Sequence, residues 1–432
     1  MNAGSVSDRR ALEALRNGVP NRDAVRVLGC NQPEAEERFT ALLGMLADAS
    51  AADTQVAGML VSGGFGSGKS HLLEYFEHLA LSENCVTSRV VVSKETPLYD
   101  PAKVFRAAIE SACVPGRSGM AIPEIALSLR QDSRQYAELY RWANTAEELA
   151  AIFPATLLLH ERLNNDPELA EQIRNFWSGD PLPIARVREG LRQIGEAAAF
   201  SLRSVRMRDL TEQRIAFVAR LIRGAGYRGW VVLIDEVELV GRYSLLQRGR
   251  SYAELARWLG RIEGFQVPGI LTVAAVTDDF ALAVLQQKGD RDYVGARLRD
   301  RGTDEFLALA ARAEAGMRII DREALTLRAP TDEMLVATYE RLKEIHARGY
   351  NWQPPEIARA DRSMRRAMRS HVRRWMNEWD LKRLYPGAAV VTEEQTLKSS
   401  YDEDVTLEEP NEDDGMDVDA TGDGAFERRW DA

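Results

Sequence analysis

The sequence predicts an α/β protein with a central parallel sheet, a large helical insertion and a helical region near its C-terminal end. Short apolar runs recur along the 432 residues and alternate with stretches whose apolar positions have helical spacing, which is typical of a parallel sheet. Between the second and third of these runs, residues 120–222 contain long helical stretches and no convincing strand. No internal repeat is apparent, and no apolar run approaches the roughly 18 residues that cross a bilayer.

Each predicted strand is a short apolar run that ends in glycines, polar residues or carboxylates. The run at residues 230–234 is continuously apolar, as a strand buried on both faces must be. Helices are expected at residues 69–80 and 101–112, after the first two strands, in an entry segment over 8–48, and over 331–384. The five expected strands are residues 56–61, 90–92, 230–234, 270–276 and 324–327.

The net charge of −10 is concentrated at one end of the chain. Residues 392–432 contain 15 acidic and three basic residues, a net charge of −12, which leaves +2 for residues 1–391. The acidic segment has almost no apolar residues to bury, so we expect it to be disordered. A charge of +2 over 391 residues is far from the strongly basic surface of a dedicated DNA binder.

The cysteines and histidines exclude two kinds of protein. Cys30, Cys85 and Cys113 have no CxxC spacing, which argues against a disulfide framework and a zinc site. The five histidines do not occur at metal-ligand spacing, so we expect any metal to come with a nucleotide. The first ten residues are polar and lack the apolar core of a secretory signal. A reducing cytoplasm is the expected compartment.

The strongest motif is a phosphate-binding P-loop. Residues 63–70 fit GxxxxGK[ST] at every fixed position and stand between a predicted strand and a predicted helix. In this motif backbone N–H groups surround the β-phosphate, Lys69 reaches the β- and γ-phosphate oxygens and the Ser70 hydroxyl is a Mg²⁺ ligand. The alternative is a glycine-rich turn with a solvated lysine. The expected nucleotide contacts are Gly63, Gly64, Phe65, Gly66, Ser67, Gly68, Lys69, Ser70 and His71.

A second motif, WVVLIDE at residues 230–236, supplies carboxylates at the end of a buried strand. We expect Asp235 to hold Mg²⁺ and Glu236 to polarise the attacking water. An exposed acidic turn is the alternative. Glu238 adds negative charge nearby and is assigned no role.

The remaining candidates are less specific. Thr277 follows the next strand and is expected to orient the attacking water, although an ordinary polar strand end is the alternative. Arg299, with Arg297 and Arg301, is a candidate arginine finger for the nucleotide of a neighbouring subunit, or part of a solvated basic helix. Arg365, Arg366 and Arg369 lie on the expected C-terminal helices. Three interpretations stay open for them: a lid contact to nucleotide, a solvated helix face, or a contact to a nucleic-acid phosphate backbone.

With these motifs placed, the architecture resembles an AAA+-type P-loop NTPase with a C-terminal helical lid. Several stretches also resemble the ATP-binding proteins of bacterial BREX phage-defence systems, the BrxD-like P-loop family. They include RRALEALRNGVPNRDAVRVLGC near the start, VVVSKETPLYDPAKVFRAAIESA after the P-loop and RSMRRAMRSHVRRWMNEWDL near residue 370. The resemblance extends over most of residues 9–385, and it places Arg365 where the lid arginine is expected.

The resemblance implies ATP and Mg²⁺ as cofactors, and a defence role beside other BREX components such as a helicase or a methyltransferase. We expect an ATPase that remodels or loads a partner complex on DNA, with DNA contact and homo-oligomerisation both open and no membrane. The alternative is a nucleotide-gated interaction module with little turnover. The expected parts are an N-terminal helical segment (1–50), the P-loop half of the core (51–119), a helical insertion (120–222), the carboxylate-bearing half (223–328), the lid (329–390) and a disordered acidic tail (391–432).

Overall fold

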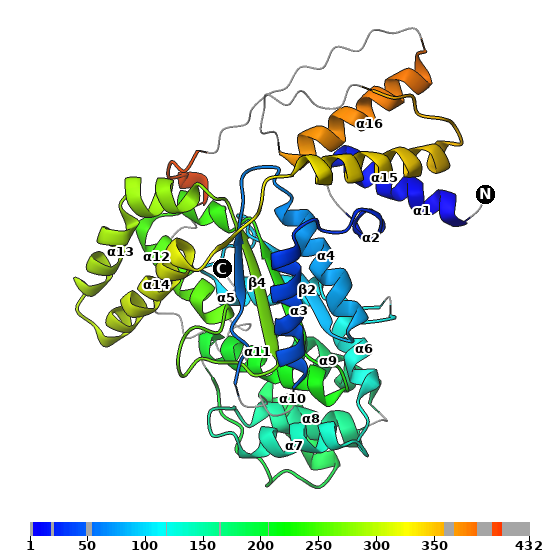
Figure 1. Cartoon of the computed structure of the whole chain (residues 1–432). Helices are drawn as coiled ribbons and strands as arrows, with labels where there is room; N and C mark the ends of the chain where they lie inside the picture. Colours follow the sequence, from blue (N-terminus) through cyan, green and yellow to red (C-terminus); the bar gives the residue numbers. More distant parts are fainter. Residues whose placement is uncertain are drawn as a thin grey trace, which may run out of the picture.

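A computed structural model of the chain has a central sheet of five parallel strands with helices on both faces (Figure 1). It describes residues 3–18, 21–48, 54–117, 119–163, 166–205, 207–357, 367–386 and 400–407. The strands lie in the order β2-β3-β4-β1-β5. Their bounds are β1 Met59–Ser62, β2 Val86–Val91, β3 Trp230–Asp235, β4 Ile270–Val276 and β5 Leu325–Thr326.

The predicted strands are all present, with different bounds. The largest difference is in β2, which begins four residues before the expected run because its first half is polar. Thr87 and Ser88 are nevertheless buried, and the Ser88 hydroxyl accepts a hydrogen bond of 2.8 Å from the Trp230 indole N–H. Polar residues that find partners inside the protein hide a buried strand from a search for apolar runs.

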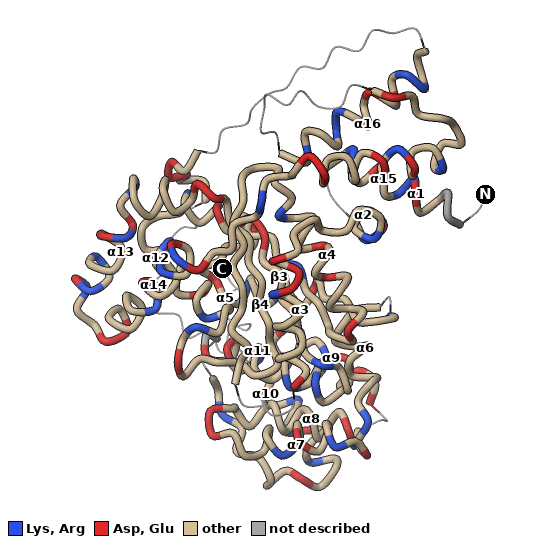
Figure 2. The backbone as a smooth tube through the Cα atoms, viewed as in Figure 1, with Lys and Arg blue, Asp and Glu red and all other residues tan. Residues whose placement is uncertain are grey.

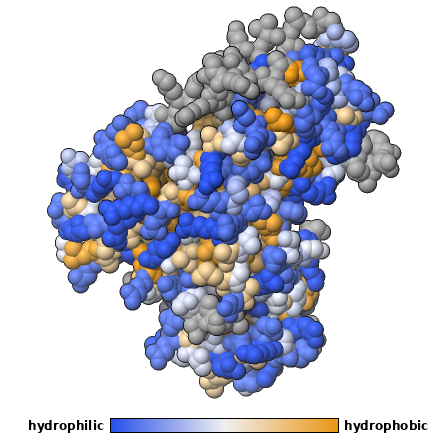
Figure 3. Space-filling model, in the orientation of Figure 1, coloured by the Kyte–Doolittle hydropathy of each residue, from blue (hydrophilic) through white to orange (hydrophobic). Residues whose placement is uncertain are grey.

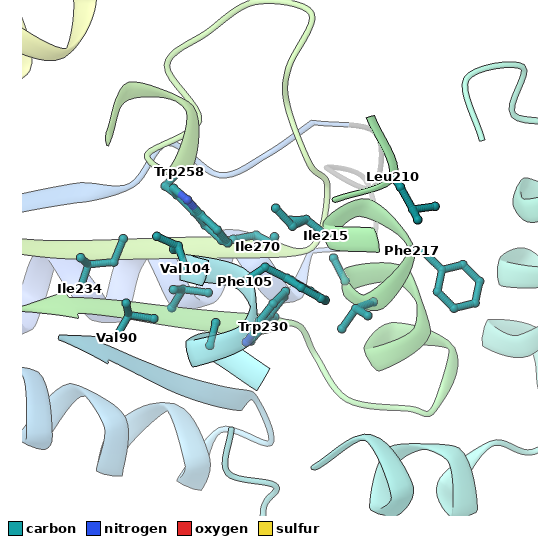
Figure 4. Close-up of a cluster of buried hydrophobic side chains, with 14 of the residues drawn as sticks. Val90, Val104, Phe105, Leu210, Ile215, Phe217, Trp230, Ile234, Trp258 and Ile270 are labelled. Carbon is teal, nitrogen blue, oxygen red and sulfur yellow. The ribbon is translucent and has the colours of Figure 1, made fainter. Parts of the chain in front are cut away.

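Alternate residues of β3 pack into two different layers. Val231 and Leu233 join the core formed with α3 (Pro33–Ala47) and α4 (Lys69–Ser82). Trp230 and its neighbours on the other face join the core formed with α5 (Pro101–Glu110), α11 (Met207–Gly224) and α12 (Leu245–Trp258), as Figure 4 shows. Burial on both faces explains why the strand is apolar throughout.

Between β2 and β3 the described residues form helices and one isolated bridge, between Thr87 and Cys113. The helices α7, α8 and α10 lie at the end of the molecule opposite α15 and α16 (Figure 1). Phe153 of α8 packs against Phe217 of α11 with ring centroids 5.1 Å apart, which joins this region to the helix that covers the sheet. The bounds are α6 Ala121–Ser128, α7 Arg134–Thr145, α8 Ile152–Arg162, α9 Pro167–Ser178 and α10 Ile184–Gln193.

The N-terminal helices are divided between two parts of the molecule. Helices α1 (Ala3–Asn17) and α2 (Arg22–Leu28) share a core with α15 (Asp332–Tyr350) and α16 (Met368–Leu384), whereas α3 packs on the sheet. We call α1, α2, α15 and α16 the lid cluster. Its core is aromatic, with Tyr339 edge-on to Trp375 at 5.3 Å between ring centroids.

A third group of helices lies beside the carboxyl ends of β3 and β4. It consists of the short helices η2 (Val237–Arg242) and η3 (Ala281–Gln287), with α12, α13 (Asp290–Arg299) and α14 (Asp304–Arg322). Acidic and basic residues are interspersed along α13 and α14 (Figure 2). The face drawn in Figure 3 is mostly hydrophilic, with small apolar areas between polar ones. No helix among the described residues is long and apolar enough to cross a membrane.

Part of the expected disordered tail lies against this helical group, which corrects the expectation for residues 400–407, including η4 (Val405–Leu407). Arg242 pairs with Asp404 at 2.5 Å and Arg248 with Glu403 at 2.7 Å. The backbone N–H of Asp404 donates to the Arg242 carbonyl at 3.0 Å. Acidic composition predicts disorder for an isolated segment, but here basic side chains of the folded part offer partners. The other residues of 391–432 lie outside the described ranges.

Candidate nucleotide-binding site

The P-loop, residues 63–70, joins the end of β1 to the start of α4, as the sequence predicts. Gly66 and Gly68 have φ angles of 76° and 104°, in the left-handed region that favours glycine. At Gly63 a Cβ atom would lie 2.5 Å from the Ser67 hydroxyl, so the loop closes tightly on itself. Helix α4 begins directly after Gly68, which leaves its first N–H groups available to an anion.

Lys69 is buried within this loop. Its ammonium donates to the Gly63 carbonyl at 2.9 Å and lies 3.7 Å from a carboxylate oxygen of Glu238. Burial raises the pKa of Glu238 to about 7, against the opposing effect of the Lys69 charge. The second Glu238 oxygen is buried and has no partner among the described atoms. Glu238 therefore belongs to the site, although it was assigned no role from the sequence.

Asp235 is held on both sides. One oxygen accepts from the Glu236 N–H at 3.0 Å, and the other lies 3.4 Å from the Arg89 guanidinium. Arg89 also donates to Glu74 at 2.7 Å and lies 3.4 Å from the Ser70 carbonyl, so it links the two residues expected to bind Mg²⁺. A Ser70 hydroxyl and an Asp235 carboxylate are the hard oxygen donors that Mg²⁺ prefers.

Within the described part of the chain, no group of three or more His, Cys, Asp or Glu residues is arranged to hold a metal ion. A Mg²⁺ ion at Ser70 and Asp235 would therefore need further oxygens, and Mg²⁺ commonly takes these from substrate phosphates and water. The residues present fit a metal that arrives with a nucleotide.

Glu236 follows Asp235 in a strained conformation and is exposed on the cavity beside the P-loop. Its φ of 60° lies in the left-handed region, which is unusual for a residue with a Cβ, and η2 begins directly after it. Burial and the charge of Asp235 raise the pKa of Glu236, while Lys69 and Arg369 act in the opposite direction.

Thr277 lies at the same edge of the sheet as the two motifs. It follows β4, which lies between β1 and β3, and the N–H of Gly63 donates to the neighbouring Val276 carbonyl at 3.2 Å. Thr277 is buried, and its hydroxyl lies 2.7 Å from the Tyr401 hydroxyl. The loops after β1, β3 and β4 thus bring Lys69, Asp235 and Thr277 to one edge.

The cavity extends from the P-loop to an apolar wall formed by the lid cluster. The backbone N–H of Arg369 approaches the Gly66 carbonyl at 3.4 Å, and its guanidinium lies 5.9 Å from the centre of the Phe65 ring. The buried Arg369 Nε has no partner among the described atoms. The lid residues that line the cavity include Leu15, Leu28, Met334, Thr338, Met368 and Val372.

One family model matches this chain, described as BREX system ATP-binding protein BrxC/D, over residues 7–133 and 207–381. The chain belongs to this family. The match confirms the resemblance and makes the protein a BREX defence component that binds ATP, beside other BREX components. Comparisons with curated proteins and with solved structures gave no match.

The match includes each strand that the structure describes in this BREX ATP-binding protein and most of the lid cluster. It leaves out residues 134–206, which hold α7, α8, α9 and α10. The two matched segments therefore carry the cavity of this family member, and the unmatched segment lies within the region expected to be an insertion.

Three candidate arginines of this BREX protein either lie away from the cavity or fall outside the described residues. Arg299 does not line the cavity, and it pairs on the surface with Glu314 at 2.5 Å. Arg365 and Arg366 lie outside the described residues. His71 does line the cavity, and one ring nitrogen lies 2.7 Å from the Gly29 carbonyl. Burial lowers the pKa of His71, which favours the neutral ring.

Proposed function

We propose that this BREX ATP-binding protein is an AAA+-type, Mg²⁺-dependent cytoplasmic ATPase that uses its ATP cycle to remodel or load a partner complex on DNA. The observation that carries the proposal is the position of Glu236, which lines the same cavity as Lys69 and the P-loop. A protein that only binds ATP has no need for a carboxylate beside the phosphate site. The strand order supports the AAA+ assignment, because β4 separates the P-loop strand from the carboxylate strand.

The cavity suggests how ATP is held. The adenine ring would lie against the apolar lid residues, such as Leu15 and Met334, and the phosphates would accept from the N–H groups at the start of α4. Lys69 would exchange its contacts with the Gly63 carbonyl and Glu238 for phosphate oxygens. Arg369, with an unpartnered Nε beside Gly66, would add positive charge from the lid side. Mg²⁺ bound through Ser70 and Asp235 would neutralise phosphate charge.

In the hydrolytic step we assign Glu236 the role of general base. It would orient the attacking water and take its proton, while Thr277 donates a hydrogen bond at the same edge of the sheet. The raised pKa of Glu236 makes it a better proton acceptor while Lys69 and Arg369 favour its charged form.

Glu236→Gln tests this assignment. The substitution keeps the shape of the side chain and removes the base, so we expect ATP turnover to fall about 10²- to 10⁴-fold with ATP binding retained. Lys69→Ala is the comparison variant and should lose ATP binding. The measurements are ATP affinity and ATP turnover with and without DNA. Equal turnover in Glu236→Gln and the wild type would place the base elsewhere.

The second candidate is a nucleotide-gated interaction module with little turnover. The observation that favours it is the Thr277 hydroxyl, which is already bonded to Tyr401 rather than free to face a nucleotide. ATP binding by the wild type without turnover under any condition of DNA or partner would support this candidate.

Oligomerisation and DNA contact also remain proposals. An arginine finger acts on the nucleotide of a neighbouring subunit, and Arg299 on exposed α13 is our first choice for it. Its pair with Glu314 would have to open. Arg301 is engaged with the Phe306 ring at 4.7 Å.

A further inference from the structure

Residues 400–407, which we call the strap, cross the carboxyl edge of the sheet next to the proposed catalytic residues. We propose that the strap is autoinhibitory and holds Thr277 in a state that cannot serve ATP hydrolysis. This inference rests on the proposed ATPase function. It concerns a segment that lies outside the residues matched by the family model.

Tyr401 is the side chain that connects the strap to the site. Its hydroxyl lies 2.7 Å from the Thr277 hydroxyl and donates to Asp279 at 2.8 Å. Its ring stands perpendicular to Phe280, with centroids 5.8 Å apart. At Gly241 a Cβ atom would lie only 2.8 Å from this ring, so the side chain fits closely against η2. The Tyr401 side chain is therefore docked against η2 and the segment that follows β4.

The protons of these groups determine what Thr277 can do. A carboxylate only accepts hydrogen bonds, so the Tyr401 hydroxyl proton is directed at Asp279. The short Thr277 contact then needs the Thr277 proton, because the Tyr401 oxygen can only accept there. A hydroxyl has one proton to donate, so the docked strap leaves Thr277 without a donor for a phosphate oxygen. While the strap is docked, Thr277 therefore cannot donate the hydrogen bond that we assign to it in ATP hydrolysis.

The strap is held mainly by charges that water and salt can weaken. Arg248 binds Glu403 at 2.7 Å and Arg242 binds Asp404 at 2.5 Å, and the Glu403 side chain is 49% exposed. Lys288 donates to the Tyr401 carbonyl at 2.9 Å. Although Arg248 is buried, water reaches both strap carboxylates, and salt screens such partly exposed ion pairs. Such a segment can leave the site without unfolding the sheet, as a reversible inhibitor must.

The anchor beneath the strap is more rigid. Arg248 is buried and makes two hydrogen bonds to the buried Asp290, at 2.8 and 2.9 Å, while Tyr252 donates to the same carboxylate at 2.6 Å. Asp290 thus fixes the guanidinium that receives Glu403. The receiving surface stays in place when the strap departs.

Two variants of the full chain test the inference. Tyr401→Phe removes only the hydroxyl that is hydrogen-bonded to Thr277. Glu403→Gln combined with Asp404→Asn removes the ion pairs of the strap with Arg248 and Arg242. We expect each to raise ATP turnover about three- to tenfold, the effect of losing one ordinary hydrogen bond. Asp402→Asn is the control for neutralising a strap carboxylate, because it removes one negative charge from a residue whose hydrogen bonds stay within the strap. It should keep wild-type turnover.

Hydrogen exchange supplies a readout that does not depend on turnover. The Asp404 amide is bonded to the Arg242 carbonyl, so its exchange should be faster in the Tyr401→Phe chain, where residues 403 and 404 are unchanged. If the wild type hydrolyses ATP and neither test variant exceeds it, the strap inference is wrong and the ATPase proposal stands. If all chains bind ATP and none hydrolyses it, both proposals fail. Unchanged exchange at residue 404 would also overturn the strap inference.

Discussion

At the scale of single residues, the pair of Lys69 and Glu238 links nucleotide binding to pH. Both side chains are largely buried, with exposed fractions of 9% and 14%. Glu238 competes with incoming phosphates for the Lys69 charge whenever it is ionised. Burial raises its pKa from 4.5 to about 7, so it changes charge near neutrality.

Glu238→Gln should therefore alter how the stability of the nucleotide-free protein depends on pH. A carboxyl whose pKa is raised on folding favours the folded state when protonated, and that advantage is lost as the pH rises from about 4.5 through 7. The pKa difference corresponds to at most about 3 kcal/mol. The wild type should lose this much more stability than Glu238→Gln between pH 5 and 8, measured by denaturant unfolding. Exposed Glu263, changed to Gln, is the control. Parallel pH profiles for the wild type and Glu238→Gln would contradict the assignment.

The P-loop and the Asp235–Glu236 pair could be predicted because both motifs are contiguous in sequence and follow a strand. Arg89 could not, since it lies within a strand and reaches Asp235 only through the pairing of β2 with β3. Glu238 could not either, because its approach to Lys69 depends on the left-handed turn at Glu236. Arg369 is the lid arginine that the structure describes beside the P-loop, and the expected role of Arg365, which lies outside the described residues, stays a prediction.

At the scale of elements, the lid cluster brings together helices from the beginning and the end of the region that the family model matches. Arg16 of α1 pairs with Asp380 of α16 at 2.5 Å. His346 of α15 accepts from the Trp352 indole on Nδ1, which leaves the proton on Nε2 to be donated to the same Asp380 at 3.2 Å. Helical spacing predicts these helices individually. It cannot predict that α1 packs against helices more than 300 residues later in the sequence, because an amphipathic face does not indicate which other helix it contacts.

Leu12→Ala should weaken both the lid cluster and ATP binding. Leu12 is fully buried in the core of α1, α15 and α16, and such a truncation typically costs about 2 to 5 kcal/mol. Leu15, one turn further along α1, lines the cavity, so a loosened α1 should also raise the Kd for ATP. Thermal unfolding and ATP titration measure the two effects. Leu127→Ala, at a position 76% exposed on α6, should change neither. Unchanged ATP affinity in a destabilised Leu12→Ala chain would separate α1 from the site.

At the scale of the whole molecule, one apolar core extends from the sheet into the helices between β2 and β3. The cluster that contains Trp230 and Val90 of the sheet also contains Phe153 and Trp177 of α8 and α9. The change in periodicity predicts a helical insertion at residues 120–222. The spacing of apolar residues indicates where strands end, but it does not indicate whether the helices that follow pack into the same core as the sheet.

Trp177→Ala tests whether that shared core unfolds as one unit. Trp177 is fully buried, donates to the Thr156 hydroxyl at 3.1 Å and packs 5.6 Å from Phe217 of α11. Its loss should cost about 3 to 5 kcal/mol. Because the core is continuous, we expect calorimetry to show one unfolding transition at a lower temperature, with no new early transition. Met120→Ala, at a position 79% exposed, is the control.

The same variant should bind ATP with wild-type affinity while it is folded. Helices α7, α8 and α10 lie at the opposite end of the molecule from the lid cluster (Figure 1), and the cavity is lined by none of the residues 134–206. ATP titration at a temperature well below the transition measures this affinity. A separate low-temperature transition in Trp177→Ala, with the main transition unmoved, would instead make the insertion an independent domain. That result would support the boundaries expected from the sequence, because a domain with its own core loses its structure without lowering the stability of its neighbour.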